Sequence, residues 1–434
     1  MKTVRVVGAG LAGTECAYYL ANHGFKVLLY DIKPNKYTPA HKSDKFAELV
    51  CSNSLKSNDV YANACGLLKE EMRRLGSLVI EAADSTRVPA GNALAVNRED
   101  FAEYITNKIK ENENVTFISE EITELTDDVV TVYATGPLTT DALSKSIMAK
   151  TGDGLSFYDA SAPIISAESI DMTRAFVGDR YDKGNGDHIN CPMEKDEYLA
   201  FYDALINAER TELHDFEVSV FEGCMPVEIM AKRGVDTLRF GPLKPKGLRD
   251  PKTGKSSYAC LQLRKEDGYG NSYNMIGFQT NLKFGEQKRV FGMIPALKNA
   301  EFLRYGVMHR NTFLNSPECL NADLSMKDYP NVFFAGQITG VEGYVESAAT
   351  GLLAGINVAR RLNGLETLKL DNKTMIGALS NYVATPNADF QPMNANYGIL
   401  EIGDQVKDKA ERKKRQGIRA LNEIDKIKEI INEH

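Results

Sequence analysis

The sequence lacks closely spaced cysteines. It contains seven cysteines, an odd number, and none of them forms a CxxC pair. This spacing fits neither a disulfide framework nor a zinc site, so we expect no bound metal. Cysteines that stay reduced are typical of the cytoplasm, and we therefore expect a cytoplasmic protein.

Long hydrophobic runs are also missing. The most apolar stretch beyond the N-terminal region, SAATGLLAGINVA, falls short of the roughly 20 residues that span a bilayer. The N-terminal stretch VRVVGAGLAG is interrupted by glycines and is followed closely by Glu15, which argues against a signal peptide. We therefore expect no membrane association.

The sequence has no excess of positive charge. Its 52 Lys and Arg residues against 59 Asp and Glu residues give a net charge of -7. This balance excludes a uniformly basic protein that coats nucleic acid, although it allows a local basic face. The hydrophobic content of 43% and the charged content of 26% are those of an ordinary globular protein, and 434 residues suffice for two domains.

A glycine-rich turn near the N-terminus joins a predicted strand to a predicted helix. The segment TVRVVGAGLAGTECAYYLANHGFKVLLYD reads as strand, turn, helix and strand. Gly8 permits a tight turn, Gly10 admits a pyrophosphate to the backbone, and Gly13 allows the helix to pack closely on the strand. The N–H groups at the helix start would face the phosphates. The same turn contains Ala9, Leu11 and Ala12 as further cofactor-binding candidates.

Asp31 ends the second strand of this unit, where a carboxylate can accept hydrogen bonds from ribose hydroxyls. An acidic residue there disfavours a 2′-phosphate, so the unit is predicted to bind FAD or NAD rather than NADP. A glycine turn with a purely structural role is the alternative.

The C-terminal part of the sequence points to FAD. The segment NVFFAGQITGVEGYVESAATGLLAGINVARRL reads as a short strand, a glycine turn and a helix rich in small residues. Such a helix packs tightly against another backbone or a flat group, and in two-dinucleotide flavoproteins a unit of this kind returns to the first domain. The turn and helix start supply Gly336, Gln337 and Tyr344 as cofactor-binding candidates. No second glycine fingerprint for a nicotinamide cofactor is visible.

These elements predict an α/β protein with a Rossmann-like FAD-binding domain of the two-dinucleotide-binding type. An ATG turn at residues 134–136 follows a strand expected to rejoin that domain. We expect residues 1–180 and 326–434 to form the FAD domain and residues 181–325 to form an inserted mixed α/β domain. A buried helix at the end of some other α/β sheet is the alternative for the C-terminal unit.

Two cysteines lie where a chain leaves an apolar run. Cys51, in AELVCSNSLKSN, precedes a loop rich in Ser and Asn, and Cys224, in VFEGCMPVE, lies in a turn after a β-like run. Each is a candidate nucleophile, with an inert structural thiol as the alternative. Cys16 lies on the first helix and is expected in the core.

Several segments together resemble one family. They are GAGLAGTE, ELVCSNSLKS, VPAGNALAVNREDFA, FEGCMPVE, RFGPLKP, HRNTF and AGQITGVEGYVESAATGLLAG. Over nearly its whole length the sequence resembles the folate- and FAD-dependent tRNA (uracil-5-)-methyltransferases. The resemblance implies FAD, 5,10-methylenetetrahydrofolate as the one-carbon donor and NADPH or NADH as reductant. It implies tRNA as the partner and 5-methyluridine at position 54 of the T loop as the product.

The resemblance also implies roles for individual residues. Carbon 5 of uracil is a poor nucleophile until a group adds to carbon 6, and a thiolate adds and leaves readily. Cys224 is the implied nucleophile at carbon 6, and Cys51 the implied second thiol near the flavin, although the two roles could be exchanged. The base would have to be flipped out of its stack. His309 is implied to stack on the folate pterin and Tyr344 to face the flavin, with a structural role as the alternative for both.

A basic loop is the candidate RNA-binding surface, because phosphate contacts need such charges. Its residues are Lys244, Lys246, Arg249 and Lys252. A second basic cluster, residues 412–415, is a weaker candidate, since charge runs on helices are usually solvated. Alternative functions are the same reaction on ribosomal RNA, modification of a tRNA wobble uridine, a small-molecule FAD oxidoreductase and a non-catalytic RNA-binding flavoprotein. The sequence makes no prediction of oligomeric state.

Overall fold

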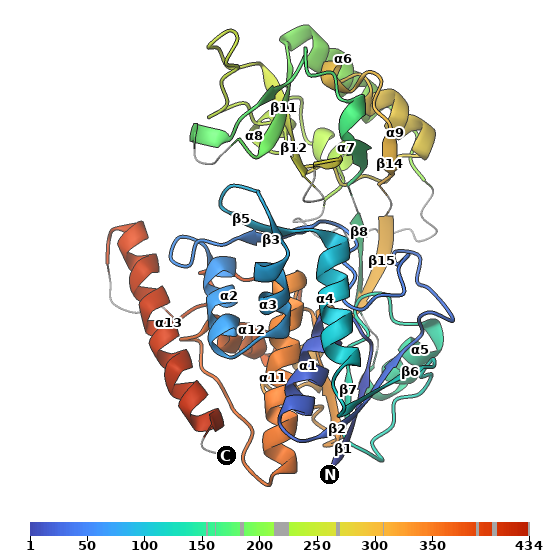
Figure 1. Ribbon diagram of the computed structural model, residues 1–434, viewed down its shortest axis with the longest axis vertical. Helices are drawn as coiled ribbons and strands as arrows, with labels where there is room; N and C mark the ends of the chain where they lie inside the picture. The colour runs from blue at the N-terminus through green and yellow to red at the C-terminus, as the bar shows by residue number, and fades with distance from the viewer. Residues whose placement is uncertain are drawn as a thin grey trace.

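The computed structural model describes residues 1–152, 155–160, 162–182, 186–211, 225–265, 270–306, 308–387, 390–401 and 406–432. For residues 155–160, 182, 309 and 310 it describes the backbone alone. The chain forms two lobes, and both termini lie at the end of the lower lobe away from the upper one (Figure 1).

A five-stranded parallel sheet forms the centre of the lower lobe, with strand order β16-β7-β1-β2-β6. The register places Val6 opposite Leu29 on one side and Val132 on the other, and all three side chains are fully buried. The strands are β1 (Thr3–Val7), β2 (Lys26–Asp31), β6 (Val115–Ser119), β7 (Thr131–Tyr133) and β16 (Val332–Phe334). The predicted return of the C-terminal unit to the first sheet is confirmed by the pairing of β16 with β7.

Helices cover both faces of this sheet. One face packs against α1 (Leu11–Asn22), α3 (Leu78–Ser85), α4 (Arg98–Lys110) and α11 (Tyr344–Leu362), and the other against α5 (Asp141–Thr151). The helical layer continues with α2 (Ala64–Arg74), α12 (Met375–Ala384) and α13 (Lys409–Asn432). A small antiparallel sheet of β3 (Ser54–Ser57), β4 (Arg87–Val88) and β5 (Ala93–Val96) faces the upper lobe (Figure 1).

A six-stranded antiparallel sheet builds the upper lobe, with strand order β10-β11-β12-β13-β9-β14. Its strands are β9 (Ile164–Ser166), β10 (Phe176–Val177), β11 (His188–Met193), β12 (Ala259–Lys265), β13 (Ser272–Met275) and β14 (Phe302–Arg304). One face packs on α6 (Lys195–Ile206), α7 (Val227–Ala231), α8 (Thr237–Phe240) and α9 (Phe284–Phe291).

Two strands connect the lobes: β8 (Leu155–Ala160) and β15 (Met308–Phe313) pair antiparallel between them (Figure 1). The short helix α10 (Ser316–Cys319) follows β15. The predicted α/β fold, a Rossmann-like sheet with an inserted mixed α/β region, is confirmed. The domain limits remain a prediction, and β9 and β10, which precede residue 181, already belong to the upper sheet.

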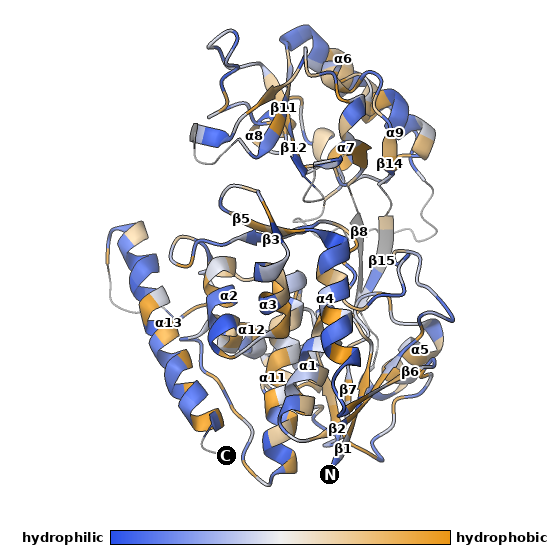
Figure 2. Ribbon diagram, in the orientation of Figure 1, coloured by the Kyte–Doolittle hydropathy of each residue, from blue (hydrophilic) through white to orange (hydrophobic). Residues whose placement is uncertain are grey.

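The C-terminal helix α13 is amphipathic. Its buried residues include Leu421 and Ile424, while most of its other positions are hydrophilic (Figure 2). Within the described ranges, no helix is long and apolar enough to cross a membrane.

Candidate functional site

The glycine turn between β1 and α1 is shaped by close backbone contacts. Gly8 has φ +105°, and a Cβ on it would lie 2.4 Å from the carbonyl oxygen of Ala134. A Cβ on Gly13 would lie 1.7 Å from the carbonyl oxygen of Gly8. Both glycines are therefore required by the packing of the turn itself, as the sequence predicts for a tight βα turn.

Gly10 differs from these two glycines. Its φ is −79°, an ordinary value, and a Cβ on it would meet no atom within 4 Å. No packing of the chain accounts for glycine here, whereas the approach of a pyrophosphate to the backbone does. The turn therefore fits a dinucleotide.

Asp31 lies beside this turn. One of its carboxylate oxygens accepts a hydrogen bond from the N–H of Ala9 at 2.7 Å, and the other accepts from the N–H of Lys33 at 2.9 Å. Each oxygen keeps a second acceptor site, so the carboxylate can still accept from ribose hydroxyls.

The C-terminal unit reaches the same turn. Gly336 has φ +82°, and its N–H donates to the Thr350 hydroxyl at 2.8 Å. The side-chain amide of Gln337 donates to Glu342 at 2.5 Å. A Cβ on Gly351 would lie 2.2 Å from the carbonyl oxygen of Ala12, which shows that α11 and α1 touch backbone to backbone. The prediction of a helix packed tightly against another backbone is confirmed.

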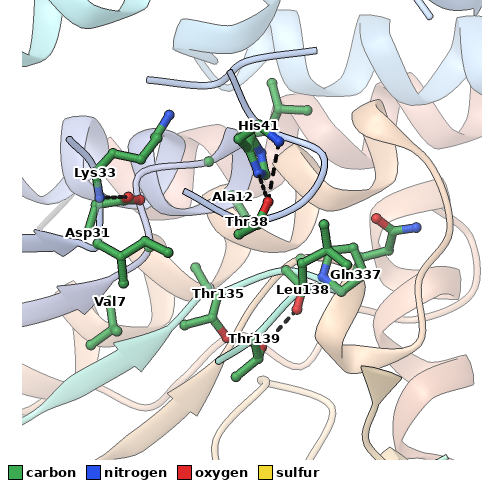
Figure 3. Close-up of a pocket in the computed structure, with 18 of the residues that line it drawn as sticks. Val7, Ala12, Asp31, Lys33, Thr38, His41, Thr135, Leu138, Thr139 and Gln337 are labelled. Carbon is green, nitrogen blue, oxygen red and sulfur yellow. Dashed lines mark hydrogen bonds between the residues drawn. The ribbon is translucent and has the colours of Figure 1, made fainter. Parts of the chain in front are cut away.

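An open cavity, with about 1150 Å³ of empty space when the adjoining solvent is included, connects these parts. Its lining includes Gly8, Gly10, Asp31, Gly336, Gln337 and Tyr344, all cofactor-binding candidates from the sequence. Figure 3 shows Asp31 and Lys33 on one side of the cavity and Leu138 and Gln337 on the other.

The lining residues that sequence reasoning missed include Lys33, Thr38 and His41. His41 Nδ1 lies 2.6 Å from the Thr38 hydroxyl, and burial lowers the pKa of His41 (Figure 3). Burial also lowers the pKa of Lys33, although neighbouring Asp31 opposes the shift. No motif marks this loop. The rule that ligands bind beyond the carboxyl ends of parallel strands could have pointed to it, since it follows β2.

Cys51 lies next to Tyr344, the first residue of α11, which lines the cavity together with Val50. Its sulfur is 3.0 Å from the Tyr344 hydroxyl oxygen, which accepts hydrogen bonds from the N–H groups of Cys51 at 2.8 Å and Ser52 at 3.2 Å. Burial raises the pKa of Tyr344, so this phenol stays protonated. The structure thus brings together two residues separated by almost 300 positions.

Both lobes hold the segment that carries Cys51. From the lower lobe, Arg98 donates to the carbonyl oxygen of Leu49 at 2.6 Å. From the upper lobe, the guanidinium of Arg264 donates to Asn53 at 3.0 Å and to the Ser52 hydroxyl at 2.7 Å. Arg304 on β14 donates to the Val50 carbonyl oxygen. Cys51 is therefore positioned at the junction of the lobes.

Cys224 lies outside the described residues, and His309 is described only as a backbone position on β15, opposite Asp159. The chain on either side of residues 212–224 is anchored to one segment of the upper lobe. The Thr211 N–H donates to Asn281 at 2.9 Å and the Val227 N–H to Gln279 at 2.7 Å.

The candidate RNA-binding loop projects from the upper lobe. Lys246, Arg249 and Lys252 are exposed and Lys244 is half-buried. The ammonium of Lys252 donates to the Thr173 carbonyl oxygen at 3.2 Å.

The other described cysteines are buried, and Cys16 lies in the core as predicted. Burial raises the pKa values of Cys65 to about 11 and Cys260 to about 12, which keeps both as thiols. In the part of the chain that the structure describes, no three His, Cys, Asp or Glu side chains are grouped as a metal site requires.

Comparisons with known proteins agree with this architecture. A family model described as "Glucose inhibited division protein A" matches residues 3–366. The chain is 56% identical to a methylenetetrahydrofolate--tRNA-(uracil-5-)-methyltransferase TrmFO of Caldicellulosiruptor bescii, with 98% of each chain covered. It is 55% identical to the protein of that name from Staphylococcus aureus strain Newman, over 99% of this chain and 100% of the relative.

A solved structure has the same fold at low sequence identity. Aquifex aeolicus GidA, in its form I crystal, superposes with a TM-score of 0.73 at 17% identity. The superposition covers 99% of this chain and 76% of that one.

Proposed function

We propose that this protein methylates carbon 5 of a tRNA uridine. The premise is that the chain belongs to the glucose inhibited division protein A family and, within it, to the methylenetetrahydrofolate--tRNA-(uracil-5-)-methyltransferases. The observation that carries the proposal is the position of Cys51. Its sulfur lies 3.0 Å from the hydroxyl of Tyr344, and Tyr344 lines the same cavity as the dinucleotide turn. A flavoenzyme that oxidises small molecules does not need a thiol there.

FAD is the dinucleotide that this cavity is proposed to hold. Gly8, Gly10 and Gly13, with Ala9, Leu11 and Ala12, would surround the pyrophosphate, and Asp31 would bind the ribose. Gly336, Gln337 and Tyr344 would lie along the flavin end. When bound, FAD supplies the electron pair that converts a transferred methylene unit into a methyl group. The reductant, NADPH or NADH, remains a prediction, as does a cytoplasmic location.

The two thiols are proposed to act on the uracil ring. The Cys224 sulfur forms a bond to carbon 6, which makes carbon 5 nucleophilic, and the same bond breaks when the proton leaves carbon 5. The Cys51 sulfur is proposed to take that proton. His309 is proposed to stack on the folate pterin, and it belongs to β15, one of the two strands that connect the lobes. The exchange of the two thiol roles stays open.

A trapping experiment tests these assignments. RNA that carries 5-fluorouracil should form a covalent complex with the protein, because fluorine cannot leave as a proton does. Cys224→Ala should abolish both the adduct and methylation while FAD is retained. Cys51→Ala should abolish methylation and still form the adduct. Cys319→Ala is the matched control, since Cys319 is buried and has no proposed role. Methylation by both the Cys51 and the Cys224 variants would refute the thiol mechanism.

A separate experiment tests the identity of the one-carbon donor. Label from methylenetetrahydrofolate should enter RNA, and label from the methyl group of S-adenosylmethionine should not. The reverse result would refute the proposed reaction.

Uridine 54 of the T loop is the proposed target. Mass mapping of 5-methyluridine in tRNA and ribosomal RNA from a deletion strain tests this position. Loss of 5-methyluridine from ribosomal RNA alone, or loss of a wobble-uridine modification instead, would assign one of the alternative substrates. The loop with Lys244, Lys246, Arg249 and Lys252 is proposed to contact RNA phosphates.

A further inference from the structure

Three aromatic rings form a continuous stack at the surface of the upper lobe. Phe284 stacks on Tyr305 with a centroid distance of 4.8 Å and an interplanar angle of 15°. Tyr305 in turn stacks on Phe302 at 5.2 Å and 4°. We call these three residues the aromatic ladder. The ladder joins the start of α9 to the edge strand β14 on the outer side of the lobe (Figure 1).

The ladder has a partly buried end and an exposed end. Phe302 packs partly against the apolar core of the upper lobe. Phe284 is 55% exposed, and because one face of its ring lies against Tyr305, the exposed part is the opposite face and the edge. An isolated exposed aromatic residue would need no explanation. A ring held flat by two parallel rings beneath it is a preformed stacking surface, and a further flat group can extend the stack with little ordering cost.

Charge next to the open face favours a nucleic acid. Lys288 lies one helical turn after Phe284 on α9, so the two side chains share a face of the helix. Lys288 is exposed and forms no ion pair with the described residues. Its neighbours are less available, since Lys283 pairs with Glu209 and Arg289 pairs with Glu286. An aromatic face beside an available ammonium matches a base followed by its phosphate.

The ladder also borders the chain segments assigned to the reaction. Val227, which follows the Cys224 segment, is bonded to Gln279, five residues before Phe284. On the other side, β15 begins at Met308, three residues after Tyr305, and carries His309. Phe284 and Tyr305 are therefore close along the chain to the segments that the proposed function assigns to the reaction.

We propose that Phe284 is a stacking platform for an unpaired base of the substrate RNA, with Lys288 contacting an adjoining phosphate. The inference rests on the proposed function and specifies how the RNA is held beside its target uridine. Unpaired bases in RNA loops are recognised in this way by aromatic side chains.

The absence of tryptophan from the sequence allows a direct test. Phe284→Trp places the only tryptophan of the holoenzyme at the platform. Ile430→Trp is the control, because Ile430 is 41% exposed on α13 and lies outside both the ladder and the basic loop. Unmodified tRNA should quench the emission of Phe284→Trp in a saturable titration and leave that of Ile430→Trp nearly unchanged. Bound tRNA without quenching in Phe284→Trp, or equal quenching in both variants, would overturn the proposal.

Affinity provides a second measurement. Phe284→Ala and Phe284→Leu should both weaken tRNA binding about tenfold, since a base stack is lost, while Phe284→Trp restores it. FAD content and kcat at saturating tRNA should not change, and Ile430→Ala should bind tRNA normally. Lys288→Ala should reduce the slope of log affinity against log salt by about 0.7 to 0.9. Unchanged affinity in Phe284→Ala would overturn the proposal.

Three outcomes separate this proposal from others. If Phe284→Ala breaks a dimer in sedimentation and leaves tRNA affinity unchanged, the ladder is an interface between copies of this chain and the proposal is wrong. If the wild-type protein makes no 5-methyluridine, the proposed function fails, whereas the fluorescence titration still decides whether Phe284 stacks on RNA. If the wild type methylates tRNA, but Phe284→Trp shows no quenching and Phe284→Ala binds tRNA normally, only the inference about Phe284 fails.

Discussion

The hydroxyl oxygen of Tyr344 accepts two backbone hydrogen bonds, from Cys51 and Ser52, and lies 3.0 Å from the Cys51 sulfur. A phenol oxygen offers two acceptor sites and one proton. With both acceptor sites used, the proton points to the sulfur. Tyr344 therefore donates to Cys51, and a hydrogen bond to sulfur favours the thiolate over the thiol.

We expect Tyr344→Phe to slow the alkylation of Cys51 by iodoacetamide at neutral pH. The expected loss is about tenfold, because a hydrogen bond to a charged group contributes about 1.5 kcal/mol or more. The rate is measured in a Cys224→Ser background, and it should recover as the pH is raised. Tyr37→Phe, at an exposed tyrosine, is the control. An unchanged rate in Tyr344→Phe would show that the phenol does not activate the thiol.

Gly10 and Gly13 should respond differently to substitution, although they belong to one motif. A Cβ on Gly10 meets nothing, so Gly10→Val should fold normally, fill the space of the pyrophosphate and yield colourless protein. A Cβ on Gly13 would overlap the carbonyl of Gly8, so Gly13→Ala should lower the melting temperature or prevent folding. Flavin absorbance and thermal unfolding measure the two effects. Full flavin occupancy in Gly10→Val would contradict the assignment of the turn.

The sequence predicted the parts of the site that local patterns encode. The turn at Gly8, the carboxylate of Asp31 and the close packing at Gly351 follow from the spacing of residues along one βαβ unit and one helix. The contact between Cys51 and Tyr344 could not be predicted, because it depends on how α11 docks against a loop almost 300 residues away. Arg264 follows the basic loop in the sequence, and the structure buries it against Ser52 and Asn53. Charge alone does not distinguish a solvated arginine from one that joins two lobes.

Two buried carboxyl groups should make stability depend on pH. Glu15 accepts hydrogen bonds from the N–H groups of Leu78 and Val79, at the start of α3. Glu71 accepts from those of Met375 and Ile376, at the start of α12. Burial raises the pKa of Glu15 to about 7 and that of Glu71 to about 8.

The raised pKa values of Glu15 and Glu71 determine whether stability rises or falls with pH. The folded chain binds more protons than the unfolded chain between the unfolded pKa, about 4.3, and the raised values. The stabilising contribution is therefore fully present below about pH 4.3 and is lost as the pH rises toward 7 and 8. In urea unfolding, the free energy of the wild type relative to Glu71→Gln should fall by up to about 1.4 kcal/mol per pH unit between pH 5 and pH 8. Glu113→Gln, at an exposed site, should follow the wild type. Parallel profiles for wild type and Glu71→Gln would show that Glu71 does not titrate in this range.

Charge reversal in the basic loop should weaken RNA binding in a salt-dependent way. Replacing Lys244, Lys246 and Lys252 by Glu removes three proposed phosphate contacts. Each lost contact should lower the slope of log affinity against log salt by about 0.9 on duplex-like RNA.

The matched control makes the same charge change elsewhere, at Lys26, Lys110 and Lys145, which are exposed on the lower lobe. If only the net charge matters, both triple variants should bind RNA equally weakly. If the loop itself binds RNA, only the loop variant should lose affinity. The ratio of flavin to protein absorbance should be that of the wild type in both, because neither set of lysines lines the cavity. An unchanged slope in the loop variant would place the RNA surface elsewhere, and the basic cluster of residues 412–415 on α13 would then be the next surface to reverse.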